Sequence, residues 1–194
     1  DTDFDKYLDC MQSYGHNFTR LWVDMNYLSW KPHPWKRTGP GLASDGLPKF
    51  DMTNFDQSYF DMIKKRLLKI QGRGMYASVM FFGSYNLMRE KFSLTTWYPG
   101  NNINIELTNA FNSTNSSSFF TTNSAALEIQ RKLVRKLVDT LNDVDNLIWE
   151  VMNEPGGTAA AVQWHKEMIN YVKSYESSKP KKHLVGMTGG WGIG

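Results

Sequence analysis

The sequence predicts an α/β fold in which helices alternate with parallel strands. Apolar residues recur at helical spacing in four segments, and a short, largely apolar run of strand length follows each of them. The order is therefore helix then strand, four times over the 194 residues. An alternation of this kind implies parallel strands that are joined by right-handed helical crossovers.

The four helices are predicted from apolar residues three and four positions apart. Gly15 ends the first, residues 72–74 end the second, Ser124 can cap the third, and the fourth covers about residues 158–176. His165 falls on the apolar side of the fourth helix, so we interpret it as a core histidine rather than a ligand. The apolar stripes are Phe4, Tyr7, Leu8 and Met11; Phe60, Ile63, Leu67 and Ile70; Leu127, Leu133, Val134, Leu137, Val138 and Leu141; and Val162, His165, Met168, Ile169 and Val172.

The four strands are predicted from short apolar runs that are bounded by Gly, Pro or polar residues. In the first strand, Thr19, Leu21 and Val23 share one face, which we expect to contact the helices. The opposite face, with Arg20 and Trp22, would then point inward and toward the strand end. The predicted strands cover residues 17–23, 75–82, 145–154 and 183–188.

Two connections are much longer than the two to six residues that are usual between strands and helices. Residues 24–54 are rich in Pro and Gly and contain Trp30, and residues 83–123 are rich in Asn, Ser and Thr and contain Trp97. Both are predicted to be long loops. Their tryptophans could stack on a ligand or simply pack the loops, and the sequence leaves both possibilities open. His33 lies between two prolines and is interpreted first as part of the loop structure.

The composition indicates one ordinary globular domain, with 41% hydrophobic and 21% charged residues. A net charge of +3 is too small to indicate binding to nucleic acid or to an anionic membrane, and no segment is long and apolar enough to span a membrane. The single Cys10 excludes an internal disulfide. The histidines His16, His33, His165 and His183 lack the spacing of metal ligands, so we expect no metal.

The third strand ends in Asn153 and Glu154, directly before Pro155 and Gly156. A following proline favours extended backbone, so we expect Glu154 to leave the strand at its carboxyl end, where reactive groups of parallel α/β folds gather. The alternative is that Glu154 is a helix-entry carboxylate near a cap at Thr158.

The apolar strand that leads into Asn153-Glu154-Pro155 resembles the retaining glycoside hydrolases of clan A, the superfamily that includes the cellulase-like family 5 enzymes. The resemblance implies that this segment closes the fourth strand of a (β/α)8 barrel. It further implies that Glu154 is the general acid/base and that Asn153 hydrogen-bonds the 2-hydroxyl of the sugar beside the cleaved bond.

The first helix, the residues Gly15, His16 and Asn17, and the strand with Arg20 resemble the first helix and second strand of the same clan. This implies that Arg20 lies near the nucleophile and keeps that carboxylate ionised. The alternative is that Arg20 forms a structural ion pair. Glu150 cannot be the second catalytic carboxylate, because four residues of strand place it ~13 Å below Glu154. We expect Glu150 to face inward and to be paired or hydrogen-bonded.

Laid on this clan, the four strands correspond to the second to the fifth of the barrel. The first strand, the sixth to eighth strands and the nucleophile, a Glu that closes the seventh strand, have no counterpart here. We therefore expect residues 1–194 to be a fragment of a single (β/α)8 catalytic domain. Two unpaired edge strands predict that the chain alone is poorly soluble and inactive.

The resemblance implies a retaining hydrolase that acts on a β-linked oligo- or polysaccharide and needs no cofactor. Trp22, Trp97 and other loop aromatic residues would hold sugar rings. The alternatives are a non-catalytic carbohydrate-binding barrel or an inactive fragment, and a metal-dependent barrel hydrolase is disfavoured by the scattered histidines. The sequence does not determine the compartment, although the substrate class favours an extracellular or periplasmic location.

Overall fold

The computed structural model describes residues 2–24, 27–84, 87, 92–111 and 116–188. Its centre is a parallel sheet of four strands in the order β1-β4-β5-β6. The predicted α/β fold with parallel strands is therefore confirmed, and the open four-stranded sheet is that of a partial barrel. The strands are β1 (Phe18–Asp24), β4 (Tyr76–Gly83), β5 (Leu147–Asn153) and β6 (Val185–Gly186).

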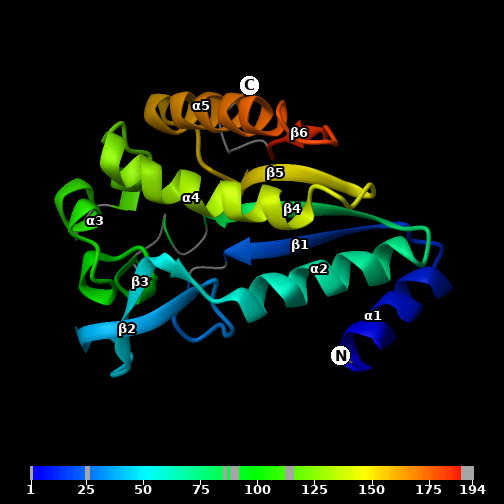
Figure 1. Ribbon diagram of the computed structural model, residues 1–194, viewed down its shortest axis with the longest axis horizontal. Helices are drawn as coiled ribbons and strands as arrows, with labels where there is room; N and C mark the ends of the chain where they lie inside the picture. Colours follow the sequence, from blue (N-terminus) through cyan, green and yellow to red (C-terminus); the bar gives the residue numbers. More distant parts are fainter. Residues whose placement is uncertain (1, 25–26, 85–86, 88–91, 112–115, 189–194) are drawn as a thin grey trace.

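The crossover helices lie side by side on one face of this sheet, as Figure 1 shows for α2, α4 and α5. Side chains cap their amino ends: Asp56 for α2, Asn123 for α4 and Thr158 for α5. The cap of α4 is thus Asn123, one residue before the predicted Ser124, since the Asn123 side chain accepts the N–H groups of both Ala125 and Ala126. The bounds are α1 (Thr2–Ser13), α2 (Gln57–Gln71), α4 (Ser124–Leu141) and α5 (Ala159–Glu176).

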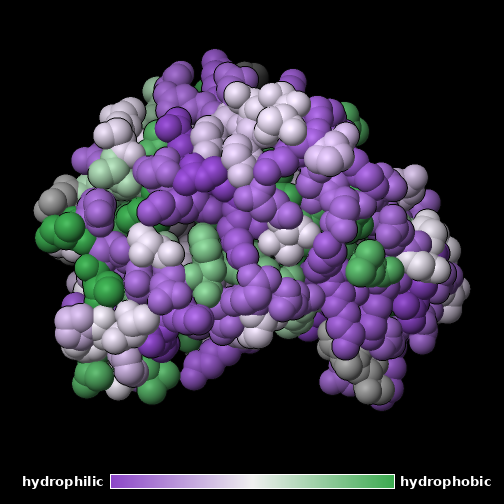
Figure 2. Space-filling model, viewed as in Figure 1, coloured by the Kyte–Doolittle hydropathy of each residue, from purple (hydrophilic) through white to green (hydrophobic). Residues whose placement is uncertain are grey.

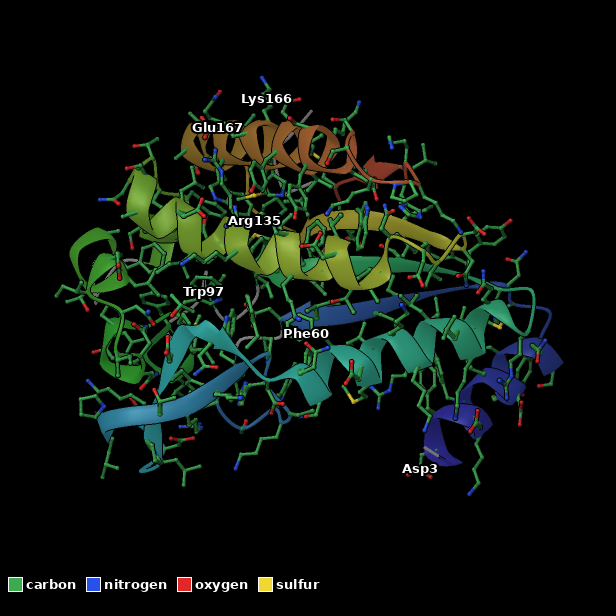
Figure 3. The ribbon with its side chains drawn as sticks, in the orientation of Figure 1. Asp3, Phe60, Trp97, Arg135, Lys166 and Glu167 are labelled. Atoms are coloured by element: carbon green, nitrogen blue, oxygen red, sulfur yellow. The ribbon has the colours of Figure 1, made fainter. Side chains whose placement is uncertain are left out.

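The core fills the space between the helix layer and the sheet. The apolar face of β1, with Leu21 and Val23, is buried against the helices as predicted. Phe60 projects from α2 toward α4, where the Lys136 ammonium lies 5.2 Å from its ring centre (Figure 3). Burial of such side chains contributes about 1.5–3 kcal/mol each. The buried helix residues include Phe60, Ile63, Leu67, Ile70, Leu133, Val134, Leu137, Val138, Leu141, Met168 and Val172.

A buried polar network holds the short strand β6 beside β5. The Glu176 carboxylate at the end of α5 accepts hydrogen bonds from the Trp149 ring, from Asn142, and from both the backbone and the ring of His183. Burial alone raises the pKa of the Glu176 carboxyl, but the hydrogen bonds from His183 and Trp149 outweigh burial and bring this pKa below its usual range. The network fixes the chain at His183, so β6 starts two residues later and is shorter than predicted.

The connection between β1 and α2 is not a long loop, which corrects the prediction for residues 24–54. It contains an antiparallel hairpin of β2 (Trp35–Leu42) and β3 (Pro48–Phe55). Gly39 and Gly41 have positive φ angles on either side of Pro40, and the pairing is irregular between Arg37 and Leu42. The sequence pattern of a strand is therefore absent from β2, although the hairpin forms.

The connection between β4 and α4 packs against this hairpin. Single bridges join Tyr27 to Thr95 and Phe50 to Asn102. Asn102 and Asn104 hydrogen-bond to nearby backbone, so the Asn-rich composition of this segment serves its own folding. Its described elements are the short helices η1 (Phe92–Leu94), η2 (Pro99–Asn101), α3 (Ile105–Ala110) and η3 (Ser116–Phe119).

Hydrophilic residues predominate on the face of the molecule that α2, α4 and α5 form (Figure 2). Among the described helices, none has the length and apolar character needed to cross a membrane. The opposite face of the sheet is exposed at the amino ends of its strands, where Phe18, Tyr76 and Leu184 lie. Phe18 and Tyr76 are partners in the β1–β4 register, so they form one apolar patch at the amino ends of these strands.

Candidate active site

The carboxyl ends of β1, β4 and β5 meet at one edge of the sheet. The register pairs Asp24 with Phe82, and Gly83 with Asn153. Ser84 and Glu154, the residues that follow these last two, therefore emerge next to each other. Figure 1 shows this edge beside the β2–β3 hairpin and the segment around α3.

The backbone of Glu154 is held in an unusual conformation at this edge. Its φ angle is +43°, and no other non-glycine residue in the described part of the chain has a positive φ. The prediction of an extended backbone is therefore wrong. The Glu154 N–H donates to Thr188 Oγ1 at 3.0 Å, and its carbonyl accepts from Ser84 Oγ at 2.9 Å. Two side chains from neighbouring strand ends thus stabilise a conformation that costs about 1–3 kcal/mol and that is frequent at functional sites.

The Glu154 side chain is exposed, in contrast to its fixed backbone. Its carboxylate makes no hydrogen bond or ion pair with any described residue. The cap of α5 is Thr158, as the helix-entry interpretation expected, and its hydroxyl accepts the Ala161 N–H at 3.2 Å. The Glu154 carboxylate itself bonds no described N–H group of α5, so it has no structural partner in the described part of the chain.

Below this edge, Arg20 and Glu150 form a bidentate ion pair across three strands. Arg20 Nη2 lies 2.5 Å from Glu150 Oε1, and Arg20 Nε lies 3.1 Å from Glu150 Oε2. Ser78 Oγ, on β4 between them, donates to Glu150 Oε2 at 2.7 Å. Glu150 is therefore an inward-facing, paired acid, as predicted. Arg20 makes the structural ion pair that was its alternative interpretation.

Arg20 also contacts Asn153, the residue before Glu154. Its Nη2 donates to Asn153 Oδ1 at 2.9 Å. An amide whose oxygen accepts this bond must direct its NH2 group elsewhere. That NH2 group has no partner among the described residues. Arg20 and Asn153 are thus brought together with Glu154 at one sheet edge.

The aromatic candidates divide into exposed and buried rings. The Arg20 guanidinium lies over Trp22, 5.3 Å from the centre of the indole ring. Trp22 and the half-exposed Trp30 both line a cavity of about 140 Å³. Trp97 is fully buried, and its indole N–H donates to Asp24 Oδ2 at 2.5 Å (Figure 3). The prediction that Trp97 holds a sugar is therefore wrong. Trp35 is buried too.

His33, His165 and His183 make structural contacts. His33 Nε2 lies 3.2 Å from the Leu28 carbonyl oxygen, and burial lowers the pKa of this imidazole. His165 is buried in α5, where burial likewise lowers its pKa, in agreement with a core histidine. Within the described ranges, no group of three or more His, Cys, Asp or Glu side chains is placed to hold a metal.

Three residues of the site were missed by sequence reasoning: Ser78, Ser84 and Thr188. Ser84 had a signal, because it follows an apolar strand directly and must lie at the carboxyl edge. Ser78 interrupts the apolar run of β4 on the inward face, which is where a polar residue needs a partner. Thr188 had no comparable signal. Trp191 follows the fourth predicted strand, and we expect it at the same face from its sequence position; it lies outside the described residues.

Residues 19–191 match a family model described as "Domain of unknown function (DUF6298)". The chain belongs to the DUF6298 family. No curated protein sequence matches this DUF6298 chain.

Solved structures resemble the DUF6298 chain in fold. An endo-1,4-beta-D-mannanase from Thermotoga petrophila RKU-1 is 17% identical with a TM-score of 0.60, over 95% of this chain and 50% of the mannanase. An endo-1,4-beta-mannanase from Rhizomucor miehei is 16% identical with a TM-score of 0.62, over 95% of this chain and 51% of that mannanase. A GH5-4 broad-specificity endoglucanase from Clostridium longisporum is 12% identical with a TM-score of 0.56, over 96% and 44%.

At this level of identity the comparison establishes the fold alone. The DUF6298 chain spans about half the length of the mannanases that it matches. Its α/β sheet with covering helices is thus a glycoside hydrolase family 5-like fold, over part of the barrel that those proteins contain.

Proposed function

We propose that this chain forms part of a retaining glycoside hydrolase of clan A that cleaves a β-linked oligo- or polysaccharide, with Glu154 as the general acid/base. The observation that carries the proposal is the backbone conformation of Glu154 together with the position of its carboxyl group. Its backbone is strained and fixed by two hydroxyl groups, while its carboxyl group stands free at the carboxyl edge of a parallel sheet. In barrel enzymes catalytic groups occupy this edge.

Glu154 would act twice in the reaction. Its protonated form donates a proton to the glycosidic oxygen as the bond to the leaving group breaks and the nucleophile attaches to the sugar. Its carboxylate then takes a proton from the water that releases the sugar from the enzyme. The fixed backbone keeps the carboxyl group in place for both steps.

Asn153 and Arg20 would support this chemistry. The NH2 group of Asn153, which has no partner among the described residues, would donate a hydrogen bond to the 2-hydroxyl of the sugar in the cleaved position. Arg20 Nη1 has no partner among the described residues, and its side chain is 33% exposed, so it can contact a nucleophilic carboxylate. Trp22, whose ring centre lies 5.3 Å from the Arg20 guanidinium, would line the sugar position.

The nucleophile and the remaining strands would come from residues outside this chain. Glu150 does not supply the second catalytic group, because it lies four residues before Glu154 and is engaged with Arg20 and Ser78. The exposure of Phe18 and Tyr76 at the amino ends of β1 and β4 supports further strands that would close the barrel over them.

The test is the Glu154→Gln variant of a protein that contains this chain and the rest of its barrel. We expect hydrolysis of substrates with poor leaving groups, such as natural oligosaccharides, to fall by about 10²–10⁴-fold, the usual contribution of a general acid. Dinitrophenyl glycosides, which need no protonation to leave, would still show release of the first phenol.

A matched control is Glu167→Gln, the same chemical change at a partly exposed position of α5 (Figure 3), where the carboxylate accepts a hydrogen bond from Gln163. It should behave as the wild type on both substrates. Equal activity of Glu154→Gln and wild type on natural oligosaccharides would remove Glu154 from the role. A wild-type protein that binds oligosaccharides without cleaving them would instead indicate a carbohydrate-binding barrel.

A further inference from the structure

The carboxylate of Glu150, below Glu154, is surrounded by hydrogen-bond donors. The Glu150 carboxylate accepts three hydrogen bonds: two from Arg20 and one from Ser78. Its side chain is 8% exposed, whereas that of Arg20 is 33% exposed. Burying a carboxylate is unfavourable unless its partners compensate for the lost water, so all three bonds are needed to hold the charge there.

This arrangement restricts Arg20. A guanidinium that is held through both Nε and Nη2 by one carboxylate cannot rotate about its own axis. The same Nη2 donates to Asn153 Oδ1 at 2.9 Å. The position of Arg20 therefore fixes which end of the Asn153 amide faces the protein.

The orientation of the Asn153 amide determines which of its groups can face a ligand. With Oδ1 facing Arg20, Asn153 can offer only its NH2 group to a ligand. Were the amide to turn over, two donors would face each other and an acceptor would face the ligand. The orientation of the amide thus depends on Glu150 and Ser78. Glu150 lies four residues before Glu154, and Ser78 lies five residues before the end of β4, so neither is close enough to the strand ends to react with substrate.

We propose that Glu150 and Ser78 are positioning residues that, through Arg20, hold the Asn153 amide with its NH2 group toward the substrate and so select sugars with an oxygen acceptor at that point. This inference rests on the proposed function. It goes beyond it because it assigns a role in substrate discrimination to two residues that do not touch the substrate.

The experiment compares paired aryl β-glycosides with and without the 2-hydroxyl group, using a protein that contains the whole barrel. The discrimination ratio is kcat/KM for the 2-hydroxy substrate divided by kcat/KM for the 2-deoxy substrate. We expect Asn153→Ala to lower this ratio by about tenfold or more, which is the effect of one hydrogen bond in a desolvated site. Glu150→Gln should lower it to the same degree, and the double variant Glu150→Gln/Asn153→Ala should lower it no further.

Two milder variants guard against simple misfolding of Glu150→Gln. Ser78→Ala removes one hydrogen bond to Glu150 and should lower the ratio by a smaller factor. Arg20→Met/Glu150→Leu replaces both charges by apolar groups, which spares the protein a lone buried charge, and should match Asn153→Ala. If the discrimination ratio in all of these variants equals that of wild type, because kcat/KM falls equally for the 2-hydroxy and the 2-deoxy substrate, the role is purely structural and the proposal is overturned.

A second readout separates this inference from the proposed function. The Asn153 side-chain NH2 pair can be followed by NMR in the same protein, with its resonances assigned by Asn153→Ala. In wild type we expect one amide orientation, and in Glu150→Gln and Ser78→Ala a shifted or broadened pair. If wild type cleaves no glycoside, the proposed function fails while this measurement still decides whether Glu150 orients Asn153. An unchanged NH2 pair in both variants would overturn the positioning role.

Discussion

At the scale of single residues, the site shows where local sequence rules yield to tertiary contacts. The proline after Glu154 predicted an extended backbone, but hydroxyl groups of Ser84 and Thr188 hold Glu154 at a φ of +43°. Those partners are 70 and 34 residues away in the sequence, so no local rule could include them. Glu150 was predictable as a paired acid, because strand spacing places it inside the sheet and away from Glu154.

The exposure of the tryptophans in the two long connections could not be predicted from the sequence. Trp97 and Trp30 both lie in polar, Gly- and Pro-containing segments, yet Trp97 is buried and Trp30 is half exposed. The difference comes from Asp24, which accepts the Trp97 N–H at the end of β1. The partner is remote in sequence, and both outcomes fit the same composition.

His165 gives a prediction about pH. Burial lowers the pKa of its imidazole, while the Ala161 carbonyl oxygen lies 3.1 Å from Nδ1, and Nε2 is buried without a partner in the described structure. An unfolded chain takes up a proton near pH 6.5, whereas folded His165 takes one up only at lower pH. The free energy of unfolding should therefore fall as the pH drops from about 6.5 toward the folded pKa, by at most about 1.4 kcal/mol per pH unit.

The variant His165→Phe keeps a ring beside Trp164 and removes this titration. We expect urea unfolding at pH 7.5 to change little and the loss of stability between pH 6.5 and 5.5 to become smaller. His16→Phe, at an exposed position, is the matched control and should keep the wild-type slope. A slope that is the same in His165→Phe and wild type would show that other groups cause the pH dependence.

At the scale of secondary structure elements, the order and direction of the main strands followed from the alternating pattern. The apolar run of β4 and the stripes of α2 and α4 are each consistent along their length, so the elements were recognisable. The β2–β3 hairpin was not, because β2 contains Pro40 between two glycines with positive φ and lacks alternating apolar residues. Its stability comes instead from contacts such as Phe50 with His33 and Arg37.

The hydroxyl groups that join the ends of β4, β5 and the segment after β6 should matter more for activity than for stability. Ser84→Ala removes one hydrogen bond to the Glu154 backbone, and Thr188→Val removes one to Glu154 and one to the Met152 carbonyl. We expect each to cost about 1 kcal/mol in the free energy of unfolding. If the fixed backbone positions the acid, each should also lower kcat on natural oligosaccharides by about tenfold or more while KM changes little.

Ser44→Ala is a suitable comparison for these variants, since Ser44 hydrogen-bonds Asn101 and the Ser93 carbonyl away from the sheet edge. It should lower stability by a similar amount without the loss of kcat. Equal losses of kcat in all three variants would mean that stability alone determines the effect.

At the scale of the whole molecule, helices cover one face of the sheet. Phe18, Tyr76 and Leu184 lie exposed at the amino ends of the strands on the other face. We propose that further barrel strands cover it, and we predict that residues 1–194 expressed alone associate or precipitate. A longer chain that supplies these strands should elute as a discrete species in size-exclusion chromatography. Clean monomeric behaviour of residues 1–194 with retained hydrolysis would contradict the fragment interpretation.

The central claim, that Glu154 supplies and removes the proton, is tested most directly by azide rescue of Glu154→Ala in a protein with a complete barrel. With a dinitrophenyl β-glycoside the variant should accumulate the glycosyl-enzyme, because no base remains to activate water. Azide needs no base and should attack the sugar in place of water, which restores turnover and yields a β-glycosyl azide. The absence of rescue by azide, or an α-glycosyl azide as product, would contradict the claim.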